Sequence, residues 1–381
     1  MNPYTFKLYS SVSQLPDEWD IQAVENIFLS TAYLEILEKS APSNMTSYFI
    51  GIFENMTLIG VALSQFLDVN QLQSFGERDQ CLKTSIRNFI FRNFGSHVLF
   101  IGNNMLTGQN ACAFRKGCNI PLALKTLKSA AEALQADLKS KGKKVHILTF
   151  KDFEADEISL FDKDDFKTFY QFSTQPNMVF NVNPNWKTEQ DYIDALTKKY
   201  RDQYKRARKK ANGVEKRKMH LEAILAHENI IYKLYLNVAK NAPFNTFFLA
   251  KNHFSTFKKI FQDKFLFYGY FINEKMVGFN TMIKNGKSLD TYFLGYDESM
   301  QREKMLYLNM LYDMIAYGIK KEFEEIIFSR TALEIKSSVG AKPIKTYGFM
   351  KHESDILNRY MSKIFPYLEP ELVWQERNPF Q

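Results

Sequence analysis

The sequence predicts a mixed α/β protein in which one structural unit occurs twice. The main evidence is a pair of similar segments, IGIFENMTLIG at residues 50–60 and YGYFINEKMVG at residues 268–278. Aligned without a gap, they share two glycines, a phenylalanine and a turn asparagine, at Gly51/Gly269, Phe53/Phe271, Asn55/Asn273 and Gly60/Gly278. Each segment has the pattern of two strands joined by a tight polar turn. We therefore expect a β-hairpin at the same place in each of two related domains.

The sequence after each hairpin continues in a similar order. LFIGNN at residues 99–104 resembles YFLGYD at 292–297, and each is followed by a helix-like stretch and an apolar strand, VHILTF at 145–150 or IIF at 326–328. A hairpin, a third strand, a helix and a fourth strand, occurring twice, predict two α+β domains, each with a mixed, mostly antiparallel sheet flanked by helices. We expect these domains at residues 1–170 and 221–381, joined by a connecting strand and a basic helix at 171–220.

The second half also shows clear hydrophobic periodicity. It predicts helices at residues 221–239, 251–262 and 305–319. It predicts strands at residues 266–271, 277–283, 290–294, 326–328 and 344–349.

Composition limits the class of protein. A chain of 381 residues is long enough for two domains with separate cores, and its 34 Phe and 20 Tyr predict cores or a binding groove rich in aromatic rings. The cysteines Cys81, Cys112 and Cys118 lack metal-ligand spacing and indicate free thiols in a reducing compartment. Neither a signal peptide nor a long apolar run is visible, so we expect a cytoplasmic protein without a transmembrane segment. The net charge of +8 favours an anionic partner.

Much of the positive charge lies in a predicted helix at residues 188–212. Thr188 and Asp191 have the spacing of a capping pair, and Gly213 suits a left-handed terminating residue. One packing stripe recurs at helical spacing: Tyr192, Leu196, Tyr200, Tyr204, Ala207 and Ala211. The other faces are basic: Lys198, Lys199, Arg201, Lys205, Arg206, Arg208, Lys209 and Lys210. These like charges repel one another, which predicts that an anion binds to them. The alternative is a solvated basic face.

A second polar group follows the apolar strand at 326–328. Arg330, Glu334 and Lys336 lie in the loop directly beyond it, a common place for binding or catalytic groups. The alternative is a cluster of surface salt bridges. The six histidines do not cluster along the sequence, and no Ser-His-Asp or Cys-His arrangement is visible. No metal site is therefore expected.

Three segments resemble the GNAT superfamily, specifically the tandem-GNAT acyltransferases related to the FemABX peptidoglycan aminoacyl transferases. They are the basic helix with its ARKKANGV ending, the FYGYFINEKMVGFNTMI hairpin with TYFLGYDE, and SRTALEIKSSVGAKPIKTYGF near the end. FLSTAYLEILEKSAP, before the first hairpin, also resembles the opening of these domains, so the resemblance covers the chain to about Lys351. It implies two tandem GNAT-like domains. The tail around Trp374 has no counterpart in the family.

One departure from the superfamily concerns the acyl donor. Conventional GNAT enzymes bind the CoA pyrophosphate at a glycine-rich turn before a helix, but residues 297–305 contain no glycine. The resemblance therefore leaves the cofactor open between acyl-CoA and another activated acyl donor. Some of the FemABX-type relatives take their acyl group from a charged tRNA or a carrier protein.

The resemblance implies acyl transfer to an amine, which assigns roles to particular residues. Lys336 would contact the developing oxyanion or a donor phosphate, and Glu334 would orient Lys336 or accept a proton. The donor or another anion would be bound by basic residues: Arg201, Arg206, Arg208, Lys209 and Arg330. An apolar substrate groove would be lined by aromatic residues, for which burial in the core is the alternative: Phe244, Phe247, Phe248, Tyr292 and Tyr296.

The sequence thus predicts an N-acyltransferase that joins an activated acyl group to a small-molecule or lipid-like amine, in lipid or cell-envelope biosynthesis. Its expected partners are an acyl carrier protein or tRNA, with peripheral membrane contact. One alternative is aminoacyl-tRNA-dependent extension of a cell-wall precursor, in which the basic helix contacts tRNA phosphates. Another is a non-catalytic RNA- or membrane-surface-binding protein on the same fold.

Overall fold

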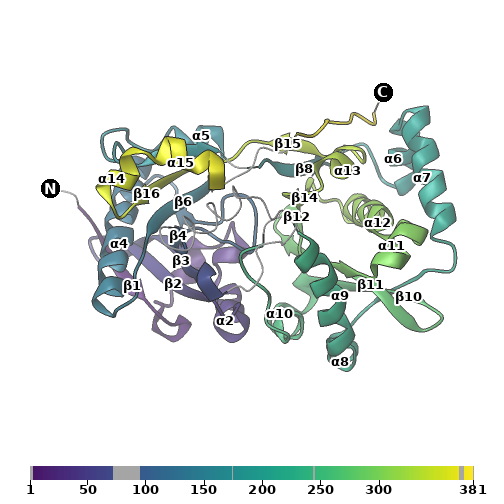
Figure 1. Cartoon of the computed structure of the whole chain (residues 1–381), viewed down its shortest axis with the longest axis horizontal. Coiled ribbons are helices and arrows are strands. Elements are labelled where there is room, and N and C mark those ends of the chain that lie inside the picture. The colour runs from purple at the N-terminus through teal and green to yellow at the C-terminus, as the bar shows by residue number, and fades with distance from the viewer. Residues whose placement is uncertain (1–2, 72–94, 174, 243–244, 369–372, 381) are drawn as a thin grey trace. The chain divides into compact units, whose positions relative to one another are not determined.

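The computed structural model describes residues 3–71, 95–173, 175–242, 245–368 and 373–380 (Figure 1). The chain forms two units, each assembled from two stretches of sequence. Unit 1 comprises residues 1–175 and 345–372, and unit 2 comprises residues 176–344 and 373–381. Each unit is built on its own eight-stranded sheet.

The sheet of unit 1 has the strand order β1-β2-β3-β4-β6-β16-β7, with β5 paired to β3. β4 and β6 run parallel, and the other neighbouring pairs run antiparallel. The strands are β1 (Tyr4–Tyr9), β2 (Met45–Glu54), β3 (Thr57–Asp68), β4 (His97–Ile101), β5 (Cys112–Phe114), β6 (Ile147–Phe153), β7 (Tyr170–Ser173) and β16 (Tyr347–His352). The α-helices are α1 (Trp19–Gln22), α2 (Thr31–Ser40), α4 (Ile120–Ser140), α5 (Ala155–Ile158), α14 (Asp355–Arg359) and α15 (Met361–Leu368).

The sheet of unit 2, taken from its opposite edge, repeats this order as β9-β10-β11-β12-β14-β8-β15, with β13 paired to β11. Here β12 and β14 run parallel and the other pairs antiparallel. The strands are β8 (Asn177–Asn181), β9 (Glu215–Lys218), β10 (Phe265–Ile272), β11 (Lys275–Asn285), β12 (Ser288–Thr291), β13 (Gly295–Tyr296), β14 (Glu325–Ser329) and β15 (Lys342–Ile344). The helices are α6 (Glu189–Ala195), α7 (Lys198–Lys210), α8 (Leu221–Ala226), α9 (Glu228–Asn241), α10 (His253–Phe261), α11 (Glu298–Lys304), α12 (Leu306–Lys320) and α13 (Leu333–Ser337).

The two predicted hairpins are confirmed at equivalent positions, as β2–β3 and β10–β11. Both turns place two consecutive residues at positive φ, with Asn55 at 48° and Asn273 at 46° as the first of each pair. This is the backbone that a two-residue hairpin turn needs, and asparagine tolerates it better than most residues. Both hairpins also carry a register shift at the same place, between Ile52 and Phe53 and between Tyr270 and Phe271.

The second matched pair of segments is out of register in the structure. The N–H of Gly102 bonds to the carbonyl of Leu63 at 3.0 Å, and the N–H of Tyr292 bonds to the equivalent carbonyl of Thr281 at 2.9 Å. Gly102 therefore occupies the place of Tyr292, not that of Gly295 as the sequence alignment assumed. The strand predicted at 290–294 is correspondingly β12, which ends at Thr291.

The two units exchange strands, which the sequence-based domain ranges did not include. β16 comes from the end of the second repeat but pairs with β6 and β7 in unit 1. β8 follows the first repeat but pairs with β14 and β15 in unit 2. The predicted strand at 344–349 is consequently two strands in two sheets. Residues 176–220, expected to be a connector, belong to unit 2.

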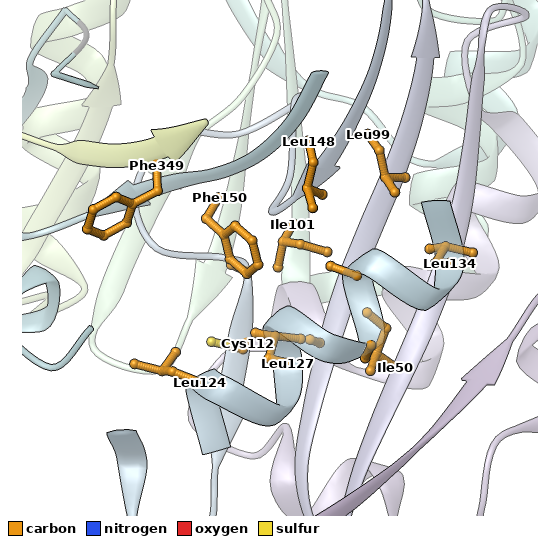
Figure 2. Close-up of a cluster of buried hydrophobic side chains, with 14 of the residues drawn as sticks. Ile50, Leu99, Ile101, Cys112, Leu124, Leu127, Leu134, Leu148, Phe150 and Phe349 are labelled. Atoms are coloured by element: carbon orange, nitrogen blue, oxygen red, sulfur yellow. The ribbon is translucent and has the colours of Figure 1, made fainter. Parts of the chain in front are cut away.

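The core of unit 1 forms where α4 covers its sheet (Figure 2). Leu127 of α4 is fully buried with Leu99 of β4 and Phe150 of β6. Phe349 of the exchanged strand β16 joins this core, with its ring 5.0 Å from that of Phe161. Burying each such side chain contributes about 1.5–3 kcal/mol. The exchanged strand is therefore held by packing as well as by backbone pairing.

Helices cover both faces of the sheet in unit 2. Leu266 of β10 packs in a core with Tyr192 of α6 and Leu311 of α12. The next residue, Phe267, points to the other face and contacts Phe254 of α10 at 5.8 Å between ring centroids. We use these contacts to name the two sides of the sheet the α12 face and the α10 face.

The predicted basic helix at 188–212 is interrupted in the structure. Its capping box at Thr188 and Asp191 is confirmed, and Gly213 has the expected positive φ of 82°. However, α6 ends before Leu196, and α7 starts after Thr197. Thr197 donates its N–H to the carbonyl of Pro379 at 2.8 Å, so pairing with the C-terminal tail causes the break.

Candidate active site

In unit 2, the parallel strands β12 and β14 stop pairing at their C-terminal ends. Their register runs from Ser288 opposite Glu325 to Asp290 opposite Ile327. Beyond it, the Thr291 hydroxyl donates to the carbonyl of Ile327 at 2.9 Å, and the chain after Thr291 turns back to bond with β11. The two strands therefore separate at the C-terminal end of the parallel pair, while each stays paired with its other neighbour. This is a common location for binding residues in α/β folds.

The loop that leaves β14 has an unusual backbone. Ser329, Thr331 and Ala332 have positive φ values of 62°, 68° and 47°. Each such non-glycine residue costs on the order of 1 kcal/mol, and strained residues of this kind concentrate at functional sites. Lys336 holds the loop in place, because its Nζ donates to the carbonyls of Ser329 at 3.1 Å and Arg330 at 2.6 Å.

Lys336 is a deeply buried lysine, with 4% of its surface exposed. Burial disfavours the ammonium and lowers the pKa of Lys336 from 10.5 to about 7. An ammonium has three N–H donors, and the two carbonyls use two of them. A protonated Lys336 therefore keeps one donor, and near neutral pH it can gain or lose a proton.

Asp290 of β12 is a second buried ionisable group of unit 2. It is 6% exposed and lies across the backbone from Ile283 and Ile327. Burial raises its pKa from 3.8 to about 7. A side-chain hydrogen bond with Asn285 opposes this rise, and the charge of Glu325 adds to it. Lys336 and Asp290 are thus two buried groups of unit 2 with separate surroundings, and each is a candidate for proton transfer near neutral pH. The sequence analysis missed Asp290, since a lone aspartate in a short strand gives no local signal.

Glu334 does not have the surroundings expected of a proton acceptor. Its side chain is half exposed and accepts hydrogen bonds from the N–H of Gln375 at 3.1 Å and from Arg377 at 3.2 Å. These bonds, that of Gln375 first, lower the pKa of Glu334, which makes it a weaker proton acceptor near neutral pH. Glu334 thus holds the C-terminal tail. Arg330 is half-buried and contributes its carbonyl to Lys336.

Two of the predicted anion-binding arginines have structural partners. Arg201 donates to the carbonyls of Asp194 and Leu196 and so closes the C-terminal end of α6. Arg208 bridges Glu189 at 2.6 Å and Asp313 at 2.7 Å. Their positive charges are consequently directed to groups within unit 2.

The exposed basic face of α7 is formed by the remaining cationic residues. Arg206 and Lys209, both predicted anion ligands, are exposed here together with Lys198, Lys199, Lys205 and Lys210. Within the described part of the chain, none of these six forms an ion pair. This face therefore keeps its charge available to an external anion.

The predicted substrate-groove aromatics occupy different environments. Phe247 is buried against Phe293, and Tyr292 is buried with its hydroxyl 2.9 Å from Nε2 of His253. These two fit the core alternative. Phe248 and Tyr296 are half-buried. Phe244 lies outside the described residues.

An open pocket of about 400 Å³ lies at the N-terminus of α11, where conventional GNAT enzymes bind pyrophosphate. Its lining includes Asp297, Glu298 and Ser299 together with Asn237 and Lys240 of α9, so two acidic residues face one lysine. The Asp297 carboxylate accepts the N–H groups of Ser299 at 3.0 Å and Met300 at 3.3 Å. A carboxylate thus already occupies the helix N-terminus, and a phosphate there would be repelled by Asp297 and Glu298.

Unit 1 contains a histidine row that the sequence analysis excluded. The rings of His97 and His146 stack at 5.0 Å, and those of His146 and His352 at 6.5 Å. These residues are far apart in the sequence, and the exchange of β16 brings His352 beside the strand that follows His146. Burial, then Lys144 and His97, lower the pKa of His146 from 6.5 to about 4.

Among the described residues, no group of three or more His, Cys, Asp or Glu residues is arranged to hold a metal ion. Within the same ranges, no helix has the length and apolar character needed to cross a membrane.

The repeated strand order, the parallel pair in each sheet and the matching hairpins define two tandem GNAT-like domains. The chain is similar to the crystal structure of FemX, with a TM-score of 0.53 and 10% sequence identity, over 88% of this chain and 94% of that one. It is also similar to a tandem GNAT protein from the clavulanic acid biosynthesis pathway, with a TM-score of 0.50 and 8% identity, over 92% and 99% of the two chains. Neither a family model nor a curated protein sequence matches the chain. The structural likeness therefore establishes the fold.

Proposed function

We propose that this protein is an N-acyltransferase that joins an activated acyl group to an amine. The observation that carries the proposal is buried Lys336, which binds two carbonyls of the positive-φ loop after β14, keeps one donor when protonated, and has a pKa lowered to about 7. The tandem GNAT-like fold supports the reaction class. Acyl transfer needs a group that removes a proton from the amine and a donor for the oxyanion.

The chemistry assigns separate roles to Asp290 and Lys336. The Asp290 carboxylate accepts a proton from the attacking amine, directly or through a water, as the new C–N bond forms. The third N–H of protonated Lys336 donates to the oxyanion of the tetrahedral intermediate. As the intermediate collapses and the ester or thioester bond breaks, the leaving oxygen or sulfur takes a proton. Lys336, with its pKa near 7, is suited to supply it.

The electrostatics of unit 2 favour a donor carried by a polyanion. The acidic pocket at Asp297 and Glu298 disfavours binding of the CoA pyrophosphate at α11. The six exposed basic residues of α7 instead favour a charged tRNA or an acyl carrier protein, which presents its thioester from an acidic surface. The acceptor is then a small or lipid-like amine.

A direct test incubates the purified protein with an amine mixture and one donor at a time: acyl-CoA, acyl carrier protein thioester or aminoacyl-tRNA. Mass spectrometry then detects the amide product. We expect product with a carrier-bound donor, and its loss in Lys336→Met. Product from aminoacyl-tRNA alone would select the tRNA-dependent reaction. If no donor yields product while tRNA or vesicles bind, the protein is a non-catalytic binding protein and the proposal is wrong.

A further inference from the structure

Unit 2 contains a basic pocket that has no role in the proposed acyl transfer. It is an open hollow of about 470 Å³, within the size range of about 300–1,000 Å³ typical of small-molecule sites. The residues that line this basic pocket are Lys218, Asp263, Tyr268, Lys284, Tyr317, Lys320 and Lys321. Four of the seven are lysines and one is acidic. Its charge is therefore strongly positive.

Separate elements bring the lysines together on the α12 face of the sheet. Lys218 of β9 lies directly opposite Tyr268 of β10. Lys284 lies an even number of residues along β11 from the partner of Tyr268, so its side chain leaves the same face. Lys320 and Lys321 are contributed by the C-terminal end of α12. The basic pocket thus combines three strands and a helix that are distant in sequence.

The positive charge of the basic pocket is poorly neutralised within unit 2. Asp263 is 86% exposed, and its carboxylate is 3.8 Å from the ammonium of Lys218. A pair so exposed contributes little. In the part of the chain that the structure describes, Lys284, Lys320 and Lys321 form no ion pair. Lysines held near one another without acids repel, and a multivalent anion relieves that repulsion.

The positive charge of the basic pocket also affects a fifth lysine, Lys258, which is buried nearby. Lys258 is 5% exposed, and its Nζ donates to the carbonyls of Gln262 at 2.9 Å and Phe265 at 3.0 Å. Its pKa is lowered by burial first and then by the charge of Lys218; Asp263 raises it, and Lys284 lowers it. Lys218 and Lys284 are therefore close enough to act on one buried group.

The helix dipole alone does not explain the cluster. Lys320 and Lys321 complement the negative end of α12, as lysines commonly do. That argument does not apply to Lys218 and Lys284, which come from strands. In addition, the rings of Tyr268 and Tyr317 lie 6.3 Å apart at 62°, and both line the basic pocket. They provide an apolar surface beside the lysines.

We propose that the basic pocket binds a phosphate-bearing ligand, with the lysines on a pyrophosphate-like group and the tyrosine rings against the organic part. Lysine ammonium groups bind phosphate oxygens through charge-assisted hydrogen bonds. This site differs from the candidate active site. Lys284 pairs with Leu289 on the α12 face, whereas Asp290, the next residue of β12, directs its side chain to the opposite face. Lys336 lies beyond the end of β14. The phosphate group belongs either to a soluble molecule or to a lipid headgroup.

The test measures binding of inorganic pyrophosphate to the full chain by calorimetry at low ionic strength, without acyl donor or amine. The variant Lys284→Gln/Lys320→Gln removes two charges from the basic pocket. The control Lys163→Gln/Lys167→Gln removes two exposed charges from unit 1. We expect wild-type affinity in the control and at least about tenfold weaker binding in the pocket variant. Equal thermal unfolding of both variants confirms that they fold.

A second arm uses vesicles of phosphatidylcholine with and without phosphatidylglycerol. Pyrophosphate binding that depends on the pocket lysines identifies a soluble ligand. Binding only to phosphatidylglycerol vesicles, again lost in the pocket variant, identifies a lipid headgroup. If neither probe binds, or if both variants lose binding equally, the basic pocket is not a phosphate site. Because no acyl donor is present in this experiment, failure of the phosphate site would not contradict the proposed acyl transfer.

Discussion

The two units share a strand order, but a buried lysine in each has different partners. In unit 1, Lys151 of β6 donates to the carbonyl of Asn103 at 2.8 Å and forms an ion pair with buried Asp152. In unit 2, Lys336 donates to two carbonyls and, among the described residues, forms no ion pair. A carboxylate neutralises the first charge, whereas burial shifts the pKa of the second to about 7.

The two units also differ in the strand that pairs in parallel with β6 or β14. The register places Phe100 of β4 opposite Thr149 in unit 1, and Asp290 of β12 at the equivalent position opposite Ile327 in unit 2. Unit 1 thus has an apolar ring where unit 2 has a buried acid. The duplicated fold supplies the same framework twice, while the buried acid at this position occurs in unit 2 alone of the two.

The largest expected effect is on turnover in Lys336→Met. The methionine keeps most of the side-chain length but removes the donors, so turnover should fall by about a hundredfold under saturating donor. The wild-type rate should also depend on pH near 7, where both Lys336 and Asp290 titrate. Circular dichroism provides the folding control. Near wild-type turnover in a folded Lys336→Met protein would remove the lysine from the mechanism.

Lys151→Met should have the opposite profile, with a large loss of stability and little loss of turnover per folded molecule. The substitution leaves Asp152, whose side chain is 3% exposed, without its cationic partner. Breaking a buried pair in this way costs about 3–5 kcal/mol. Urea unfolding measures the loss, and amide formation by the folded fraction measures activity. A stable but inactive variant would place the chemistry in unit 1 instead.

A third difference is the pH response of unit 1. His146 is held neutral, since its Nδ1 accepts the N–H of His97 at 3.3 Å and its pKa is lowered from 6.5 to about 4. Above pH 6.5 neither folded nor unfolded chains protonate it. As pH falls from 6.5 toward 4, the unfolded chain binds a proton that the folded chain excludes. Stability should therefore decrease, by about 1–2 kcal/mol at pH 5.

Urea unfolding at pH 7.5 and pH 5 measures this loss. The control is His146→Asn, whose side-chain oxygen can still accept the N–H of His97 but does not titrate. Its stability should depend less on pH. The same slope in both proteins would assign the pH response to other groups.

Local chemistry made part of this architecture predictable. Asn55 and Asn273 marked the two turns because their preference for positive φ is intrinsic to the residue. The capping box at Thr188 and Asp191 was visible for the same reason. The strand exchange was not, because residues 344–349 have the pattern of one apolar strand, and the choice of sheet depends on distant packing such as that of Phe349.

The candidate site was predictable only in outline. Lys336 was found because it follows a strong apolar strand, but its carbonyl partners depend on the backbone of Ser329 and Arg330. Glu334 gave the same sequence signal and instead binds the tail. The sequence could not separate these two residues, since burial and partner choice arise from the tertiary fold.

The smallest expected effect compares charges within α7. Arg206→Gln/Lys209→Gln removes two exposed charges, so affinity for a tRNA or carrier-protein donor should fall severalfold and its salt dependence should flatten. Thermal stability should hardly change. Arg208→Gln should behave in the opposite way, because it removes the cation that joins Glu189 to Asp313 and leaves Asp313 with Lys216 alone, while the exposed face stays intact. Binding titrations at low and high salt, together with thermal unfolding, distinguish the two. If the double variant binds every donor as the wild type does at both salt concentrations, the exposed basic face of α7 is only a solvated surface, and the anionic carrier must bind elsewhere.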